Sequence, residues 1–346
     1  MESKYNFVLL EENEYDEWDL LVKESPQGTV FHESWWMKQN ENHRIFGCRN
    51  VNGDLIAGFT CYEHRLYSTL KCLGNYVVGA YQGCIYKKAE GKYITILSFN
   101  RELSHAMANT IKDYCVTANI RMSPYEMTDV MSFIWAGFMT NVSYTHILDL
   151  KDMNAVWNGM DLDCRNSIRK AMKDGIYIDI ECDFNQILIL VKKTFQRQNK
   201  KITPNSWVDK SIIYNREAET LSRCRSFVAK TKDGVPIAVV YIIWDNKRGY
   251  YALSGYDHSN AHHGASSLAL WTAIEYTRNE LGLREFDFEG TMLQNLEPFF
   301  RQFGGKLTPY YSVSWIDRRL KPFLTLKWFM REMYGALTSK VRVSDE

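Results

Sequence analysis

One order of predicted elements occurs twice along this chain and limits the folds that it can adopt. The first half contains a strand hairpin over residues 45–62 and the second contains another over residues 226–244, each turning at aspartate and glycine residues. Each hairpin is followed by a further strand, a long helix (94–118 or 266–281) and a second strand. This order predicts two copies of one mixed α/β domain packed together.

Both halves also end with the same two elements, an aromatic segment and a strand. The aromatic, glycine-containing segment 133–138 precedes a strand over 143–150, as the segment 299–304 precedes a strand over 310–316. We therefore place the boundary between the halves near residues 150–156. The predicted parts are an N-terminal domain over 1–150, a C-terminal domain over 151–320 and a tail over 321–346.

The composition is that of an ordinary globular protein. A chain of 346 residues with 45% hydrophobic and 24% charged residues can bury about two cores of common size. Its formal net charge of +1 argues against a generally basic surface for nucleic acids, so polyanions would have to bind at local patches. The eight cysteines form no CxxC pair and no zinc-ligand spacing, which indicates reduced, buried thiols and no metal site.

One region of the second half has a layout that suits acyl transfer. A strand ending near Tyr256, itself a substrate-binding candidate, leads through a polar loop to Gly264 at the start of a helix. Backbone N–H groups at such a helix start can bind an anionic or carbonyl group. A short strand follows over residues 285–290, and its alternation places Asp287 and Glu289 on one face.

Several stretches of the chain match one family pattern, and together they give a resemblance that covers roughly residues 30–315. The chain resembles the Fem family and its acetyltransferase-like domain, a family that contains the peptidoglycan interpeptide-bridge aminoacyltransferases and relatives found with polysaccharide synthesis. The resemblance implies an α/β (α+β mixed sheet) fold of tandem GNAT-like (acyl-CoA N-acyltransferase-like) domains. The matching stretches are FHESWWMK (31–38), RNSIRKAMKDG (165–175), TFQRQN (194–199), GASSLALWTAIEY (264–276), REFDFEG (284–290) and FFRQFGGKLTPYY (299–311).

This resemblance implies an N-acyltransferase that forms an amide on an amine of a cell-envelope precursor, either a peptidoglycan peptide or an amino sugar. The acyl donor is expected to be an aminoacyl-tRNA or an acyl-CoA, and no cofactor is expected to be tightly bound. A second hypothesis is that the chain is a catalytically inactive GNAT-like binding or scaffold module in polysaccharide or cell-wall assembly.

The substrate-binding candidates lie in three of these motifs. In the family, a lysine after the tryptophan of the N-terminal motif contacts the phosphate-bearing acceptor, and Lys38 after Trp36 takes the matching place. Arg165 and Arg169 are spaced i, i+4 on one predicted helix, and Arg197 lies on a second, so these cations can hold phosphate groups. For the charged residues the alternative is an ordinary solvated surface position.

The donor-binding candidates are His263, Gly264, Ala265 and Ser266. GNAT enzymes that use acetyl-CoA bind its pyrophosphate with a (Gln/Arg)-x-x-Gly-x-(Gly/Ala) turn at a helix start. Here the turn reads Ala-His-His-Gly-Ala-Ser, so the leading Gln or Arg is absent and serine replaces the last small residue. This departure favours an aminoacyl-tRNA over coenzyme A, and the structural alternative is a glycine that only shapes the loop.

The acid/base candidates are Glu289 and Asp287. An amine acceptor must lose a proton to attack an ester or thioester, and a carboxylate with a raised pKa can take that proton. Such carboxylates also serve as structural acceptors for loop N–H groups, which is the alternative for both. His262 and His263 are weaker candidates. No Gly-x-Ser-x-Gly elbow occurs, so we expect direct transfer without a covalent enzyme intermediate.

The two ends of the chain give predictions about where in the cell the protein lies. The N-terminal residues lack the basic and apolar regions of a secretion signal, and no run approaches the roughly 20 apolar residues of a membrane span, so we expect a cytoplasmic protein. The segment 321–337 has the pattern of a basic amphipathic helix. It is expected either to dock on the body of the protein or to contact the inner face of the membrane.

Overall fold

The structure is a computed structural model of the 346-residue chain. It describes residues 4–76, 78–126, 130–181, 184–197, 207–260, 262–290, 292–320 and 322. The predicted tail lies outside these residues, apart from residue 322. None of the helices within the described ranges is both long enough and apolar enough to cross a membrane.

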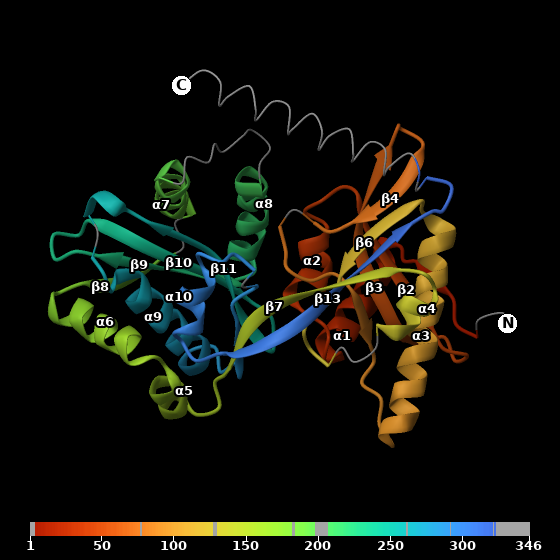
Figure 1. Cartoon of the computed structure of the whole chain (residues 1–346), viewed down its shortest axis with the longest axis horizontal. Helices are drawn as coiled ribbons and strands as arrows, with labels where there is room; N and C mark the ends of the chain where they lie inside the picture. Colours follow the sequence, from red (N-terminus) through yellow and green to blue (C-terminus); the bar gives the residue numbers. More distant parts are fainter. Residues whose placement is uncertain are drawn as a thin grey trace.

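One mixed sheet runs through the whole molecule (Figure 1). Its order within the described residues is β1-β2-β3-β4-β6-β13-β7-β12-β11-β10-β9-β8, with β5 paired to β3 beside this path. The strands are β1 (Phe7–Leu9), β2 (His43–Arg49), β3 (Leu55–Leu66), β4 (Leu70–Gly74), β5 (Cys84–Tyr86), β6 (Thr117–Arg121), β7 (Met139–Asp149), β8 (Tyr177–Glu181), β9 (Cys224–Lys230), β10 (Pro236–Trp244), β11 (Arg248–Tyr256), β12 (Glu285–Asp287) and β13 (Lys306–Ile316).

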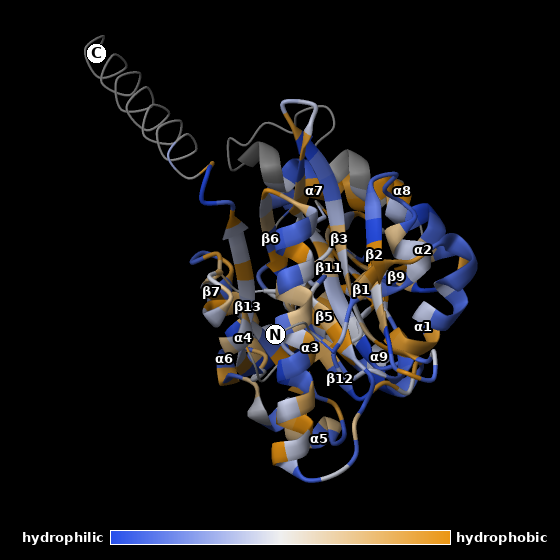
Figure 2. Cartoon of the chain, turned by 90° about the vertical axis from the view of Figure 1, so that its right-hand side faces the viewer, coloured by the Kyte–Doolittle hydropathy of each residue, from blue (hydrophilic) through white to orange (hydrophobic). Residues whose placement is uncertain are grey.

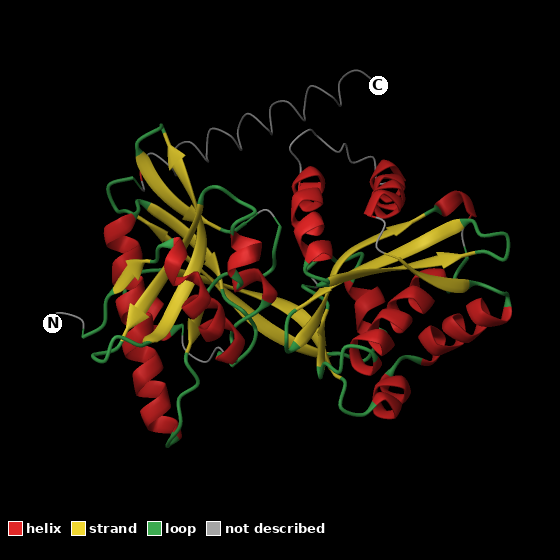
Figure 3. Ribbon diagram, turned by 180° about the vertical axis from the view of Figure 1, so that it is seen from behind, coloured by secondary structure: helices red, strands yellow, loops and turns green. Residues whose placement is uncertain are grey.

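The two halves of the chain share strands. Strand β13 comes from the second half, yet it lies between β6 and β7 of the first and is antiparallel to both. Strand β7 in turn pairs with β12, so the sheet continues into the second half without a break, as Figure 3 shows from behind. The predicted tandem arrangement is therefore present, with the last strand of the second copy built into the first.

Helices cover both faces of the sheet in each half. In the second half, α7 and α8 lie on one face, and α9 and α6 lie on the other (Figure 1). The helices are α1 (Tyr15–Glu24), α2 (Ser34–Met37), α3 (Tyr93–Tyr114), α4 (Met131–Trp135), α5 (Met153–Gly159), α6 (Leu162–Lys173), α7 (Phe184–Arg197), α8 (Trp207–Thr220), α9 (Ala265–Asn279) and α10 (Glu297–Arg301).

The long helix of the first half ends earlier than the predicted 94–118. Helix α3 stops at Tyr114, and Cys115 already has the extended conformation (φ −140°, ψ 161°). The next residues, Val116 and Thr117, are β-branched, and β6 begins at Thr117. Hydrophilic and hydrophobic residues alternate along α3 because only one side of this helix faces the core (Figure 2).

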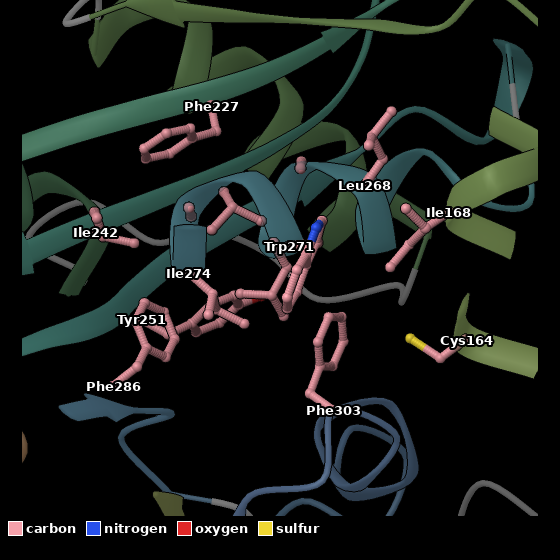
Figure 4. Close-up of a cluster of buried hydrophobic side chains, with 14 of the residues drawn as sticks. Cys164, Ile168, Phe227, Ile242, Tyr251, Leu268, Trp271, Ile274, Phe286 and Phe303 are labelled. Carbon is pink, nitrogen blue, oxygen red and sulfur yellow. The ribbon is translucent and has the colours of Figure 1, made fainter. Parts of the chain in front are cut away.

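Each half has its own hydrophobic core. In the second half α9 is buried against the sheet, and Leu268, Trp271 and Ile274 on this helix point toward residues of several other elements, including Phe303 (Figure 4). All the cysteines that the structure describes are buried, and no disulfide joins any of them, as the sequence predicted. A further buried cluster contains residues of both halves and joins them.

The boundary between the halves is packed with aromatic and aliphatic side chains. Phe31 and Trp36 of the first half lie in one buried cluster with Tyr214 and Tyr241 of the second. Polar contacts reinforce this boundary at its edge. The Val30 amide donates to Asp245 (3.1 Å). Lys247 and Arg248 donate to the carbonyls of Ser25 and Gly28, which precede Val30 in the chain. The halves therefore form one packed unit.

Candidate functional site

A cavity of about 230 Å³ lies at the boundary between the halves. Sites for drug-sized ligands measure about 300–1,000 Å³, so this one suits a small group. Its walls are mostly aromatic or aliphatic, with a few polar groups, a combination common in ligand sites. The lining residues are Phe31, Trp36, Val78, Gly79, Ala80 and Arg121 from the first half, and Phe184, Ser211, Tyr214, Asn215, Ala218, Tyr241, Ile243, Ala252, Leu253 and Glu289 from the second.

Glu289 is the acidic side chain of this cavity. It lies just after β12, in the left-handed region at φ +58°, a conformation that L residues adopt rarely. Its Oε1 atom is buried and has no hydrogen-bond partner among the described residues. Burial, followed by the negative charge of Asp287, raises the pKa of Glu289 well above its ordinary value, against the opposing effect of Arg121.

Asp287 lies behind Glu289 and is completely buried. Its carboxylate accepts hydrogen bonds from the hydroxyls of Tyr125 (2.6 Å), Tyr81 (2.9 Å) and Thr145 (2.6 Å), and from the Glu289 amide (2.8 Å). Strand β12 ends at Asp287, so Glu289 lies beyond the predicted strand and its direction is set by the turn rather than by alternation. These contacts make Asp287 a buried hydrogen-bond acceptor, and a catalytic role for it stays a prediction.

Trp36 supplies an unpaired donor in the same cavity. Only 3% of this side chain is exposed, and its indole Nε1 has no hydrogen-bond partner within the described part of the chain. A Cβ on Gly79, whose φ is +130°, would lie only 3.4 Å from that nitrogen. A buried N–H without a partner is rare and costly in proteins, so this one indicates a place for an acceptor atom of a ligand.

The predicted donor loop occupies a different place. A Cβ on Gly264 would lie 2.0 Å from the Ser167 carbonyl oxygen, so this glycine is needed for the close packing of α6 against α9. The Gly264 amide donates to Nδ1 of His262 (3.2 Å), and the Ala265 amide donates to its carbonyl (3.1 Å). His263 and Ser266 line a second pocket, of about 760 Å³, beside α6.

The other predicted binding residues do not line the cavity between the halves. Lys38 ends α2, with Nζ 4.0 Å from a Glu12 carboxylate oxygen and 5.1 Å from the centre of the Tyr15 ring. Tyr256 lines the second pocket, beside α6, and its hydroxyl donates to the His262 carbonyl (3.4 Å). Binding roles for these residues remain predictions.

The basic helices lie on opposite faces of the sheet. Arg165 and Arg169 are on α6, which covers one face together with α9, whereas Arg197 ends α7 on the other (Figure 1). The Arg169 guanidinium lies 5.3 Å from the Trp157 ring centre. The Arg197 side chain is outside what the structure describes. The two helices that carry these arginines therefore do not share one face of the sheet.

Sequence reasoning missed most of the residues that complete the site. Tyr81, Tyr125 and Thr145 contact Asp287 from positions 142 or more residues away along the chain, so no local pattern links them. Thr145 gave one weak signal, a polar residue on the strand face that it shares with Ile147. Among the described residues, no three His, Cys, Asp or Glu side chains are grouped as metal ligands.

Comparisons with known proteins agree with this architecture. The family described as the acetyltransferase (GNAT) domain matches residues 162–301. Comparison with curated protein sequences gives no match. The crystal structure of FemX is similar at a TM-score of 0.69 and 12% identity, over 93% of this chain and 99% of that chain.

Two further solved structures share the fold across both halves. The C-terminal domain of a putative lysylphosphatidylglycerol synthetase from Agrobacterium fabrum is similar at a TM-score of 0.55 and 13% identity, over 87% of this chain and 91% of that chain. A tandem GNAT protein from the clavulanic acid biosynthesis pathway is similar at a TM-score of 0.53 and 9% identity, over 89% and 98%. Residues 162–301 therefore match the GNAT-type acetyltransferase domain, and the chain as a whole has the tandem GNAT fold that it shares with FemX.

Proposed function

We propose that the protein transfers an aminoacyl or acyl group to an amine of a cell-envelope precursor, a peptidoglycan peptide or an amino sugar, at the cavity between its halves. One observation carries this proposal: the cavity holds a buried carboxyl oxygen of Glu289 and a buried N–H of Trp36, neither of which has a hydrogen-bond partner among the described residues. Acyl transfer to an amine needs one group of each kind, a proton acceptor and a donor to the carbonyl oxygen.

In the proposed reaction, the acceptor amine binds next to Glu289 and the donor carbonyl binds at the Trp36 N–H. The amine nitrogen attacks the carbonyl carbon, and Glu289 takes the proton that the nitrogen loses. The Trp36 N–H donates to the carbonyl oxygen as negative charge develops on it. The new C–N bond replaces the ester or thioester bond, and the leaving oxygen or sulfur receives a proton.

The donor in this proposal is an aminoacyl-tRNA in preference to coenzyme A. A coenzyme A pyrophosphate needs free amides at the start of α9, yet the Gly264 and Ala265 amides already donate to His262. The space next to the Gly264 Cα, where a phosphate would have to approach, is filled by the backbone of α6. Arg165 and Arg169 remain the proposed contacts to phosphates of the tRNA, and Lys38 the proposed contact to those of the acceptor.

The test of Glu289 is its replacement by glutamine. Glu289→Gln keeps the shape of the side chain and removes the proton acceptor, so turnover should fall by about 10²- to 10⁴-fold with little change in acceptor affinity. The exposed Glu280, which caps the end of α9, gives the matched control Glu280→Gln, which should keep full activity. A folded Glu289→Gln variant with normal turnover would remove Glu289 from the mechanism.

The donor is tested separately by binding. Calorimetric titration with acetyl-CoA should give weak or no binding, whereas filter binding should retain charged tRNA, with affinity that falls steeply as salt rises. Micromolar binding of acetyl-CoA without retention of tRNA would leave an acyl-CoA-dependent enzyme. If neither donor binds, the alternative of a catalytically inactive binding or scaffold module gains support.

A further inference from the structure

The segment that carries Glu289 has an unusual backbone. Glu289 and Gly290 both have positive φ values, +58° and +117°. A non-glycine residue in this region costs of order 1–3 kcal/mol and persists only where its surroundings hold it firmly. Two hydrogen bonds do so: the Glu289 amide donates to Asp287 Oδ1 (2.8 Å), and the Gly290 amide donates to Thr145 Oγ1 (3.0 Å).

Thr145 and Asp287 are joined to each other as well. The Thr145 hydroxyl donates to the same Asp287 oxygen at 2.6 Å, so this pair holds both amides of the turn. Neither residue lines the cavity, and both are 0% exposed. Their visible effect is on the conformation of Glu289, whose carboxyl group reaches the cavity from this turn.

The other oxygen of Asp287 is held by the first half of the chain. Tyr81, which lies before β5, and Tyr125, which follows β6, both donate their hydroxyls to Oδ2. The Tyr125 ring is itself fixed by the guanidinium of Arg248, which lies 3.3 Å from the ring centre. Arg248 also donates to the Gly28 carbonyl (3.1 Å), so this chain of contacts crosses the boundary between the halves three times.

From this geometry we infer that Asp287 is a positioning residue that makes the placement of Glu289 depend on the packing of the two halves. The first half supplies the tyrosine donors, β7 supplies Thr145, and the second half supplies the turn. When the halves are packed, Asp287 holds the turn and Glu289 reaches the cavity. When they separate, Asp287 loses its two tyrosine donors, and the strained turn loses a firmly held acceptor. The catalytic part of this inference rests on the proposed function.

The charges near Glu289 give this inference a measurable signature. The groups that face its carboxyl are Asp287, Arg121, Tyr81 and Tyr310. Burial raises the pKa of both carboxyl groups, and it raises that of Glu289 well above its ordinary value because Asp287 accepts four hydrogen bonds whereas Oε1 of Glu289 has no partner among the described residues. Any change that loosens the turn exposes Glu289 to water, and its pKa then falls toward the ordinary value.

The experiment compares Thr145→Val with Thr145→Ser. Valine keeps the shape but removes the hydroxyl, whereas serine keeps the hydroxyl that holds both amides. The readout is the pH titration of the Glu289 carboxyl carbon by ¹³C NMR, assigned with Glu289→Gln. We expect the serine variant to titrate like the wild type and the pKa of Glu289 to fall by about one unit or more in the valine variant. An unchanged titration in folded Thr145→Val would overturn the inference.

A second variant covers the case in which Thr145→Val does not fold. Tyr125→Phe keeps the ring on which Arg248 stacks and removes only the hydroxyl that donates to Asp287. Weaker support for the charge on Asp287 should also lower the pKa of Glu289, whereas an unchanged titration would contradict the dependence on the first half. The titration needs no substrate, and it therefore tests the placement of Glu289 without testing catalysis. Normal turnover in Glu289→Gln would reject the proposed function, and the titration would still decide this inference.

Discussion

Replacing Gly264 by alanine separates two explanations of the glycine at the start of α9. The added Cβ would lie 2.0 Å from the Ser167 carbonyl oxygen, 2.7 Å from its carbonyl carbon and 3.0 Å from the Ala171 Cβ. These are mostly backbone atoms, so α6 as a whole must move away. Overpacking usually costs about 1–3 kcal/mol, and a backbone clash places this variant at the upper end of that range.

For Gly264→Ala we therefore expect a melting temperature lower by roughly 3–4 °C, measured by differential scanning calorimetry. The control is Gly159→Ala at the end of α5, where nothing lies within 4 Å of the added Cβ and the melting temperature should not fall. If Gly264 instead served as a phosphate cradle, the alanine variant would keep its stability and lose donor binding. That result would refute the packing explanation.

Two further predictions concern groups near the boundary between the halves. Burial raises the pKa of Glu33 to about 7 from 4.5, so the folded state keeps a proton that the unfolded state loses, and stability should decrease by up to about 3 kcal/mol as pH rises from 4.5 to 7. Urea titrations should show a steeper slope in the wild type than in Glu33→Gln, where the other buried carboxyl groups still contribute; equal slopes would contradict it. Lys247 donates from Nζ to the carbonyls of Val22 (2.9 Å) and Ser25 (2.7 Å), so Lys247→Met should lose about 1–3 kcal/mol in urea unfolding. The exposed Lys23→Met should stay within about 0.5 kcal/mol of the wild type, and a Lys247 variant equally stable would refute the assignment.

Local patterns were sufficient for the elements of the fold. Both hairpins form where the turn residues and alternating strands predicted them, and α9 spans Ala265–Asn279 against a predicted 266–281. The error at the end of α3 arose because apolar residues continue from the helix into β6. The place of β13 between β6 and β7 was not predictable in this way, because that pairing joins residues more than 150 positions apart.

The candidate site was predictable only in part. The sequence predicted Phe286 and Phe288 in the core and the two carboxylates away from it, but β12 ends at Asp287, so a turn and not strand alternation places Glu289. The sequence did not distinguish the two carboxylates, since their difference arises from tertiary contacts: Asp287 meets four donors, and the Oε1 atom of Glu289 meets none within the described residues. Gly264 lies at the start of a helix, as the sequence predicted. The sequence did not show that the backbone of α6 packs against this glycine.

The central claim is that the cavity between the halves binds the group that is transferred. The most direct test follows the indole N–H of Trp36 by ¹H–¹⁵N NMR, with Trp36→Phe to assign it among the ten tryptophans. The probes are alanine methyl ester, for an aminoacyl group, and the acetyl thioester of N-acetylcysteamine, for an acyl group. Because the N–H has no partner among the described residues, a bound carbonyl should shift its resonance downfield in a saturable way, whereas the exposed Trp135 stays unchanged. An unshifted Trp36 resonance at saturating concentrations of both probes would contradict the account.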